Sequence, residues 1–302
     1  MGAFRVVSIE HPSELHVASG QLTVDQECTH VSIPLSDITL LVLFGPSIRV
    51  SSMALDLLAQ NKTLILLIGS NHLPSSMVIP MVSNARQAKI ARSQVFIPSN
   101  LRSQIWQKVI QQKIENQART LAIAGLPGST DIARFANQVL PDDTGNAEGA
   151  AARLYFQYLH PGLNRRSDDP FNSALNYGYA IVRALIARAL VTTGFIPAFG
   201  IHHQSQLNAF NLADDFIEPF RPMVDLIALQ VVNGSLKLSR DQRASLRRVA
   251  YLTVLMDSKP VALHAAVETV ADSFRSALEL DSAQFLKLPT ICPVSYIDPV
   301  RE

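Results

Sequence analysis

Short apolar runs separated by turn residues make up the first quarter of the chain. The runs are rich in aliphatic and β-branched residues, which is typical of strands packed on a core. Ser51 and Ser52 favour the start of a helix that ends near Asn61. The pattern predicts a small β domain, with strands at Phe4–Ile9, Leu22–Val24, His30–Pro34, Thr39–Phe44, Leu64–Ile68 and Met77–Pro80.

After about residue 84 the apolar positions recur at helical spacing. We therefore predict an α+β protein with a β-sandwich-like domain at residues 1–84 and a larger all-α domain at residues 85–302. Breakers such as Leu126-Pro-Gly separate the predicted helices. These helices cover Ala85–Arg92, Ser99–Ala124, Asp131–Val139, Ala147–Leu159, Asn172–Thr193, Asn211–Val232, Asp241–Met256 and Pro260–Leu280, and the tail from Leu288 is predicted to be irregular.

The stretch from Ala174 to Val191 is apolar enough to raise the question of a membrane. Arg183 and Arg188 interrupt it, which favours a buried helix of a helical domain over a membrane span. No secretion signal or uninterrupted apolar run of about 20 residues is found, so we expect a cytoplasmic protein without a membrane anchor.

Composition and charge change this picture in two ways. Charged residues make up only 17% of the chain, against 48% hydrophobic residues, which indicates a surface covered by a partner or a second copy. Residues 1–84 hold 3 Lys and Arg against 6 Asp and Glu, and residues 85–302 hold 23 against 19. The net charges are thus −3 and +4, so a nucleic-acid surface is expected in the second part. Cys28 and Cys292 lie far apart and outside any zinc-binding spacing, which excludes a disulfide framework.

The segment from Gly200 to Asp225 carries the most specific candidate chemistry. A helix starting near Asn211 puts Asp215 and Glu218 on one face, and Pro219 then forces a kink or an end. Glu218 would lie among carbonyl groups with partial negative charge, so it needs a cation or an arginine, and Arg221 is three residues away. The alternative interpretation is a surface ion-pair cluster beside ordinary loop histidines, His202 and His203.

The run Leu212–Asp225, preceded by Gly200-Ile-His-His, resembles a signature of the CRISPR-associated integrase, the large subunit of the spacer-acquisition complex. Asn146–Phe156 is similar to the segment that carries the first acidic ligand of that family, and Asn172–Ala180 resembles its Asn-Tyr-Gly helix. The likeness spans most of the chain in the same order, and it is strongest to type II systems, whose effector is a single large RNA-guided nuclease.

The resemblance implies Glu148, His203 and Glu218 as catalytic metal ligands. It implies that Asp215 lies close to the metal, either as an auxiliary ligand or as a residue that supports the ligands. His203 is preferred to His202 because it lies 15 residues before Glu218, and the choice between the two histidines stays open. Many relatives carry Asp at the position of Glu218. Two carboxylates and one imidazole form a hard site that suits Mg²⁺ or Mn²⁺.

DNA contacts are expected around this site and along two basic clusters. Arg221 either neutralises a phosphate or braces the ligand helix. The alternative role of the aromatic candidates is packing in the core. The alternative for the basic clusters is a solvated helix face without a partner. The full set of candidates is Arg221, Tyr155, Asn176, Tyr177, Arg86, Lys89, Arg92, Arg240, Arg243, Arg247 and Arg248.

The predicted function is that of a metal-dependent DNA integrase and endonuclease, which inserts protospacer DNA into a CRISPR array by attack of a 3'-hydroxyl on a phosphodiester. Two alternatives remain: a metal-dependent nuclease without integration, and a non-catalytic DNA-binding scaffold. The resemblance implies double-stranded DNA, a homodimer formed through the β domain, a small companion subunit and other CRISPR-associated proteins as partners.

Overall fold

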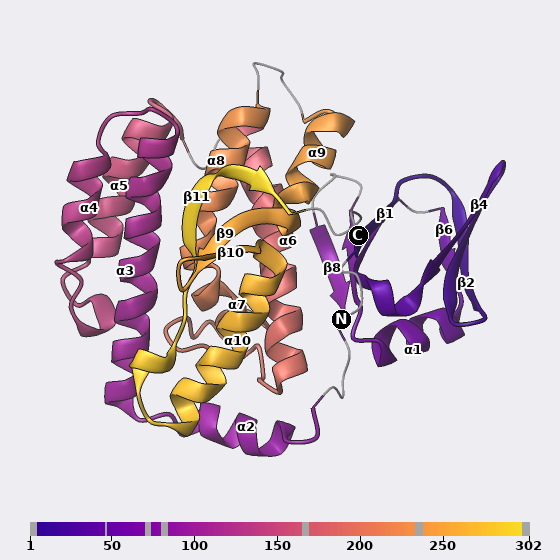
Figure 1. Cartoon of the computed structure of the whole chain (residues 1–302), viewed down its shortest axis with the longest axis horizontal. Helices are drawn as coiled ribbons and strands as arrows, with labels where there is room; N and C mark the ends of the chain where they lie inside the picture. Colours follow the sequence, from indigo (N-terminus) through magenta and orange to yellow (C-terminus); the bar gives the residue numbers. More distant parts are fainter. Residues whose placement is uncertain are drawn as a thin grey trace. The chain divides into compact units, whose positions relative to one another are not determined.

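The computed structural model describes residues 5–45, 47–69, 74–79, 84–164, 169–232 and 238–297 (Figure 1). The chain forms two compact units, one ending at Ala85 and the other running from Arg86 to Ile297. Phe4 and Pro80, which bound two of the predicted strands, lie outside the described residues, as do residues 298–302 of the predicted helical domain.

Two four-stranded sheets build the first unit. One has the order β1 (Arg5–Ile9), β5 (Ile38–Phe44), β7 (Leu64–Ile68) and β8 (Pro74–Val78), with β1, β5 and β7 parallel and β8 antiparallel to β7. The other has the order β4 (Thr29–Pro34), β3 (Gln21–Gln26), β2 (Ser13–Ala18) and β6 (Ile48–Val50). The 3-10 helix η1 (Leu35–Asp37) leads into β5.

The core of this unit lies between the sheets and beneath α1 (Ser52–Gln60). The side chain of Ser51 caps α1 by accepting a hydrogen bond from Ala54 N at 3.2 Å, as the sequence predicted. Buried and exposed residues alternate at the start of β2, whereas β5 is buried along almost its whole length, which explains its continuous apolar run. The β-sandwich-like prediction is confirmed, and the shared core contains Ile9, Leu15, Leu22, Val24, Leu35, Ile38, Leu41, Leu43, Ala54, Leu58 and Ile65.

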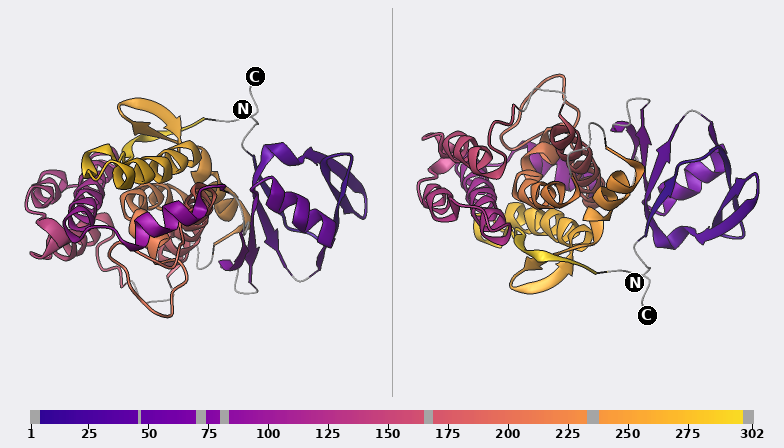
Figure 2. Two further views of the ribbon diagram at one scale, coloured as in Figure 1. Left: turned by 90° about the horizontal axis from the view of Figure 1, so that it is seen from below. Right: turned by 90° about the horizontal axis from the view of Figure 1, so that it is seen from above.

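Helices dominate the second unit, as predicted, and several of them surround α6 (Figure 2). α6 is long and apolar enough to cross a membrane, but 78% of its most apolar 18-residue window is buried inside the protein, so it is a core helix. The helical elements are α2 (Gln87–Val95), α3 (Ser99–Ile123), α4 (Ser129–Ala136), η2 (Pro141–Asp143), α5 (Ala147–Leu159), α6 (Pro170–Thr193), α7 (Asn211–Phe216), η3 (Glu218–Phe220), α8 (Arg221–Val231), α9 (Arg240–Arg247), η4 (Arg248–Tyr251), α10 (Leu263–Glu279) and η5 (Ala283–Phe285).

A three-stranded sheet in this unit corrects the all-α expectation. β9 (Leu252–Met256) lies between β10 (Lys259–Ala262) and β11 (Thr290–Tyr296), antiparallel to both (Figure 1). The helix predicted to continue to Met256 is therefore wrong beyond Tyr251, and the predicted tail is partly a strand. The left-handed residues Asp257 and Ser258 make a tight hairpin turn, and the apolar run Leu252-Thr-Val-Leu-Met lies on its first strand.

Candidate metal centre

Two acidic side chains from distant parts of the chain meet at one ammonium group. Lys113 Nζ, on α3, lies 2.5 Å from Glu148 Oε1 and also forms an ion pair with Glu218 Oε2. The side chains of Lys113 and Glu218 are 8% and 7% exposed, and that of Glu148 is 34% exposed. Burial alone would lower the pKa of Lys113, but the two carboxylates raise it above its ordinary value. The ammonium therefore stays charged.

Glu148 lies in the first turn of α5, where the preceding loop fixes the helix start. Asp143 accepts hydrogen bonds from the backbone N–H groups of Ala147 and Glu148, at 2.9 and 3.0 Å. The helix dipole places partial positive charge at the N-terminus of α5, which stabilises the carboxylates of Asp143 and Glu148. Glu148 is thus held at a helix N-terminus with its side chain partly open to solvent.

Glu218 lies at the predicted kink between α7 and α8. α7 ends at Phe216, and η3 at Glu218–Phe220 carries Pro219, which cannot donate a helical hydrogen bond. Arg221 Nε donates to Glu218 Oε1 at 2.8 Å. Burial alone would raise the pKa of Glu218, but Lys113 and Arg221 lower it to about 2. The carboxylate is therefore ionised at neutral pH despite its burial.

A buried polar stripe on α3 supports this kink. Lys113, Asn116 and Thr120 follow one another at helical spacing and are 6%, 0% and 0% exposed. Asn116 Nδ2 donates to the carbonyls of Pro219 and Pro289, at 2.7 and 2.9 Å, and Thr120 Oγ1 donates to the Pro222 carbonyl at 3.1 Å. The stripe satisfies backbone carbonyls at the helix break that would otherwise be buried without donors.

His203 is oriented by Asp215, which is fully buried. Asp215 accepts hydrogen bonds from the backbone N–H groups of Ile201, His202 and His203, and its Oδ1 lies 2.7 Å from His203 Nδ1. A Cβ on Gly200 would lie 2.2 Å from the His203 carbonyl and 2.8 Å from Asp215, so only glycine allows this close loop. The hydrogen bond to Asp215 raises the pKa of His203, against the opposing effect of burial.

The two neighbouring histidines have different surroundings. The His202 ring stacks on Trp106 with 4.2 Å between centroids and 3° between planes, whereas the His203 ring meets Trp106 edge-on at 5.9 Å. When His203 donates its Nδ1 proton to Asp215, its Nε2 carries a free lone pair, which is the arrangement of carboxylate–histidine–metal sites. These contacts favour His203 as the ligand. Asp215 accepts hydrogen bonds from the loop and contacts His203 Nδ1, which fits the supporting role, one of the two roles predicted for it.

A divalent ion requires several donor atoms that converge on one position. Within the described ranges, no three His, Cys, Asp or Glu side chains lie close enough to form a metal site in this arrangement, so the Glu148, His203 and Glu218 trio is not closed around one point. One observation nevertheless fits a cation. The ion pairs of Lys113 with Glu148 Oε1 and Glu218 Oε2 show that positive charge is accommodated between the two carboxylates.

A buried network lies behind Arg221, and the burial of two tyrosines corrects two of the DNA-contact predictions. Tyr155 and Tyr179 both donate to the buried carboxylate of Asp225, the former at 2.9 Å, and the Arg221 guanidinium lies over the Tyr179 ring at 4.7 Å. Tyr155 and Tyr177 are both 0% exposed, so neither offers a surface to a DNA strand. They belong to the core, which was the alternative interpretation, whereas Asn176 is exposed.

The basic candidates differ in exposure. Arg86, Lys89 and Arg92 are all exposed, from the residue before α2 to its last turn, and Lys89 forms a long ion pair of 4.0 Å with Glu279. On α9 and η4, Arg243 donates to the Leu238 carbonyl, Arg247 donates to the Tyr177 hydroxyl, and Arg248 lies over Tyr296. Arg240 and Arg248 are exposed, whereas Arg243 and Arg247 are half-buried. The α2 cluster is therefore the more accessible to a DNA backbone.

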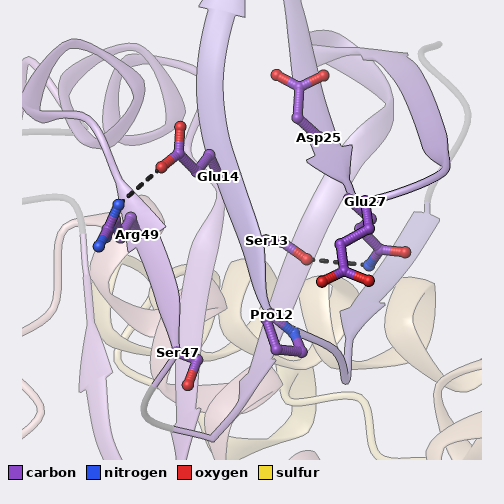
Figure 3. Close-up of a pocket in the computed structure, with 8 residues that line it drawn as sticks. Pro12, Ser13, Glu14, Asp25, Glu27, Ser47 and Arg49 are labelled. Carbon is purple, nitrogen blue, oxygen red and sulfur yellow. Dashed lines mark hydrogen bonds and ion pairs between the residues drawn. The ribbon is translucent and has the colours of Figure 1, made fainter.

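Sequence reasoning missed Lys113, Asn116 and Trp106. Their partners are 35 to 175 residues away in sequence, so no local spacing connects them to the site. A cavity of about 510 Å³ also adjoins His203, and its lining includes Gln94, Arg102, Phe199, Gln204 and Asn208. A second cavity, in the β unit, is lined by Glu14, Asp25, Glu27 and Arg49 and has a volume of about 570 Å³ (Figure 3).

The fold and the site define a two-unit α+β protein whose helical unit carries a buried acidic centre. Residues 6–250 match the family described as CRISPR associated protein Cas1. A CRISPR-associated endonuclease Cas1 of Neisseria meningitidis is 33% identical over 296 residues, which cover 96% of this chain and 97% of that protein. The chain belongs to the Cas1 family, and the resemblance found in the sequence is confirmed.

Solved structures show the same fold at low sequence identity. A casposase bound to an integration product matches with a TM-score of 0.73 and 16% identity, over 93% of this chain and 92% of that chain. A chain of a Cas6-RT-Cas1–Cas2 complex matches with a TM-score of 0.74 and 19% identity, over 96% of this chain and 36% of that chain. The arrangement of a strand-rich unit followed by a helical unit is therefore shared well beyond recognisable sequence similarity.

Proposed function

We propose that this protein is a divalent-metal-dependent DNA endonuclease and integrase whose ligands are Glu148, Glu218 and His203. One observation carries the proposal. Two carboxylates, one of them almost fully buried, converge on a cation in the same unit in which a buried aspartate orients an imidazole. Such a hard donor set suits Mg²⁺ or Mn²⁺.

When bound, the ion would lower the pKa of an attacking hydroxyl and offset the charge that develops on the phosphodiester. The residues of the chain prepare the site for this. Asp215 keeps the proton of His203 on Nδ1, so that Nε2 carries the lone pair that a metal ion can accept. Arg221 offsets charge on Glu218 and is held in place by the Tyr179 ring. The cavity beside His203 gives room for a DNA strand, and Arg102 lies in its lining.

The nucleophile decides the outcome at such a site. Attack by the 3'-hydroxyl of a captured DNA fragment joins two strands, and attack by water cuts one. The Neisseria relative is named an endonuclease, and the casposase structure contains an integration product, so both outcomes occur in proteins of this fold. We therefore assign both activities to one site in this chain.

The partners in this proposal are protospacer DNA, the repeat array, a second copy of the chain and a small companion subunit. The structure of a Cas6-RT-Cas1–Cas2 complex supports a companion of the Cas2 kind. The exposed α2 cluster of Arg86, Lys89 and Arg92 supports a DNA backbone contact. We expect this complex to act on DNA in the cytoplasm.

The test is a strand-transfer assay with a short duplex, a supercoiled plasmid carrying the repeat, and Mg²⁺ or Mn²⁺. Chelation by EDTA should abolish both joined and cut products. His203→Ala should lower both by at least about a hundredfold, whereas His202→Ala, its matched control, should retain most activity because its ring only stacks on Trp106. Full activity of His203→Ala would overturn the ligand assignment, and cut product without joined product would support a nuclease that does not integrate.

A further inference from the structure

Lys113 occupies the point at which the two carboxylates meet. Its ammonium lies 2.5 Å from Glu148 Oε1 and contacts Glu218 Oε2 as well. Glu218 Oε1 is already engaged by Arg221 at 2.8 Å. Both oxygens of Glu218 therefore face a cationic side chain, and Lys113 is the one that Glu218 shares with Glu148.

A divalent ion and this ammonium cannot use the same pair of oxygens at once. Mg²⁺ binds carboxylate oxygens at about 2.0–2.1 Å, so an ion bound to Glu148 Oε1 and Glu218 Oε2 would lie almost where Lys113 Nζ lies. Two cations at such a separation repel each other strongly, because the Lys113 and Glu218 side chains are almost fully buried and water screens their charges little. One must leave when the other enters.

The charges of the cluster make the same point. Glu148 and Glu218 contribute two negative charges, and Lys113 and Arg221 contribute two positive ones, so the cluster is balanced in the absence of a metal ion. The side chain of Glu218 is only 7% exposed, and such burial is costly for a carboxylate without a partner. Glu148 is 34% exposed, which leaves a route from solvent to the paired oxygens.

We propose that Lys113 is a resident cation, which holds Glu148 and Glu218 together in the metal-free protein and competes with the divalent ion for their oxygens. The inference rests on the proposed metal site and adds to it a positioning residue that limits metal affinity. Lys113 thereby prevents the two carboxylates from separating before the ion arrives.

Lys108 provides a matched control on the same helix. Its ammonium donates to the carbonyls of Ala283 and Leu286, at 3.2 and 2.7 Å, and to that of Gln284, so it caps a backbone turn. Removing it should disturb packing near η5 without changing the charge between Glu148 and Glu218. An effect of Lys113 that Lys108 does not share is therefore specific to the carboxylate pair.

The experiment measures Mn²⁺ binding by titration calorimetry on the full chain after removal of metal with EDTA. Lys113→Met should bind Mn²⁺ on the order of tenfold more tightly than the wild-type protein, because the competing charge is gone. Lys108→Met should bind within about twofold of wild type, and Lys113→Arg should bind no more tightly than wild type. If Lys113→Met fails to fold by circular dichroism, Lys113→Gln replaces it, with the same expectation.

The outcomes separate this inference from the proposed function. Folded Lys113→Met or Lys113→Gln with unchanged or weaker Mn²⁺ affinity would overturn the role of Lys113, while a loss of binding in Glu218→Gln would leave the metal site standing. A wild-type protein that binds no Mn²⁺, or a Glu218→Gln variant that binds as wild type does, would remove the metal site and this inference with it.

Discussion

Carboxylates, a histidine and an arginine gather in both units of this protein, but water reaches only one of the two clusters freely. In the β unit, Glu14 and Arg49 pair at 2.9 Å (Figure 3), with side chains that are 66% and 83% exposed. Asp25 pairs with His30 at the surface. In the helical unit, Glu218 and Asp215 are 7% and 0% exposed.

This difference in burial decides what the same residue types can do. Exposed ion pairs contribute about 0–1 kcal/mol, because water and salt screen them. Buried charges interact more strongly, and each of them needs ion-pair or hydrogen-bond partners at defined positions. In the helical cluster, the polar stripe on α3 and the 200–203 loop supply these partners. We therefore expect the helical cluster, and not the exposed one, to carry the chemistry.

The largest expected effect comes from exchanging one carboxylate in each cluster for its amide. Glu218→Gln should lower strand-transfer and nuclease rates by at least about a hundredfold, because a buried oxygen ligand loses its charge. Glu14→Gln should leave both rates within about twofold of wild type. Product formation on radiolabelled DNA measures the strand-transfer and nuclease rates. Equal effects of the two variants would contradict the claim that only the buried cluster is needed for activity.

The aspartates that contact histidine give the second comparison. Asp215→Asn should slow both reactions by about 10- to 100-fold, because His203 loses the acceptor that fixes its proton on Nδ1. Asp25→Asn, which alters a surface contact to His30, should have no effect on activity. A normal rate for Asp215→Asn would show that the orientation of His203 does not depend on this carboxylate.

Acid should weaken the helical cluster in a defined pH range. The pKa of Glu218 is lowered to about 2 in the folded protein from 4.5, so its contribution is present above about pH 4.5 and is lost as the pH falls towards 2. By pH 3 the free energy of unfolding should fall by about 2 kcal/mol from this group alone. Urea denaturation of the metal-free protein measures it. In Glu218→Gln, the free energy of unfolding should fall less between pH 4.5 and pH 3 than in the wild-type protein. An equal fall in the two proteins would contradict the lowered pKa of Glu218.

The smallest expected effect concerns the network behind the site. Tyr179→Phe removes a hydroxyl that donates to buried Asp225, which should lower the free energy of unfolding by about 1–2 kcal/mol. Arg49→Ala, which breaks an exposed pair, should change it by less than about 0.5 kcal/mol. Urea denaturation at neutral pH compares the two, and a larger loss for Arg49→Ala would reverse the burial argument.

Much of the fold was predictable because the relevant signals are local. Short apolar runs between turn residues identified most strands of the sandwich, and Pro219 identified the break between α7 and α8. The region after Tyr251 was predicted incorrectly because Leu252–Met256 has an apolar pattern compatible with either helix or strand. Its pairing with Thr290 and Ile291, almost forty residues later, decides between them.

The candidate site was only half visible in the sequence. The acidic residues and His203 were found through motif resemblance, and Arg221 through its three-residue spacing to Glu218. Lys113, Asn116 and Thr120 look like ordinary polar residues of a surface helix, since nothing in the sequence marks them as buried. Their partners come from α5, from the kink and from the last strand, and only the folded chain brings them together.

Asn116 also links the kink to the far end of the described chain. Its amide nitrogen donates to the Pro219 and Pro289 carbonyls, and its amide oxygen accepts from Ile291 N at 3.1 Å. During synthesis these last partners leave the ribosome some seventy residues after Glu218. The kink that carries Glu218 can therefore gain all of its buried partners only after residues 289–291 have been synthesised, so this part of the helical unit stays incomplete through the synthesis of those intervening residues.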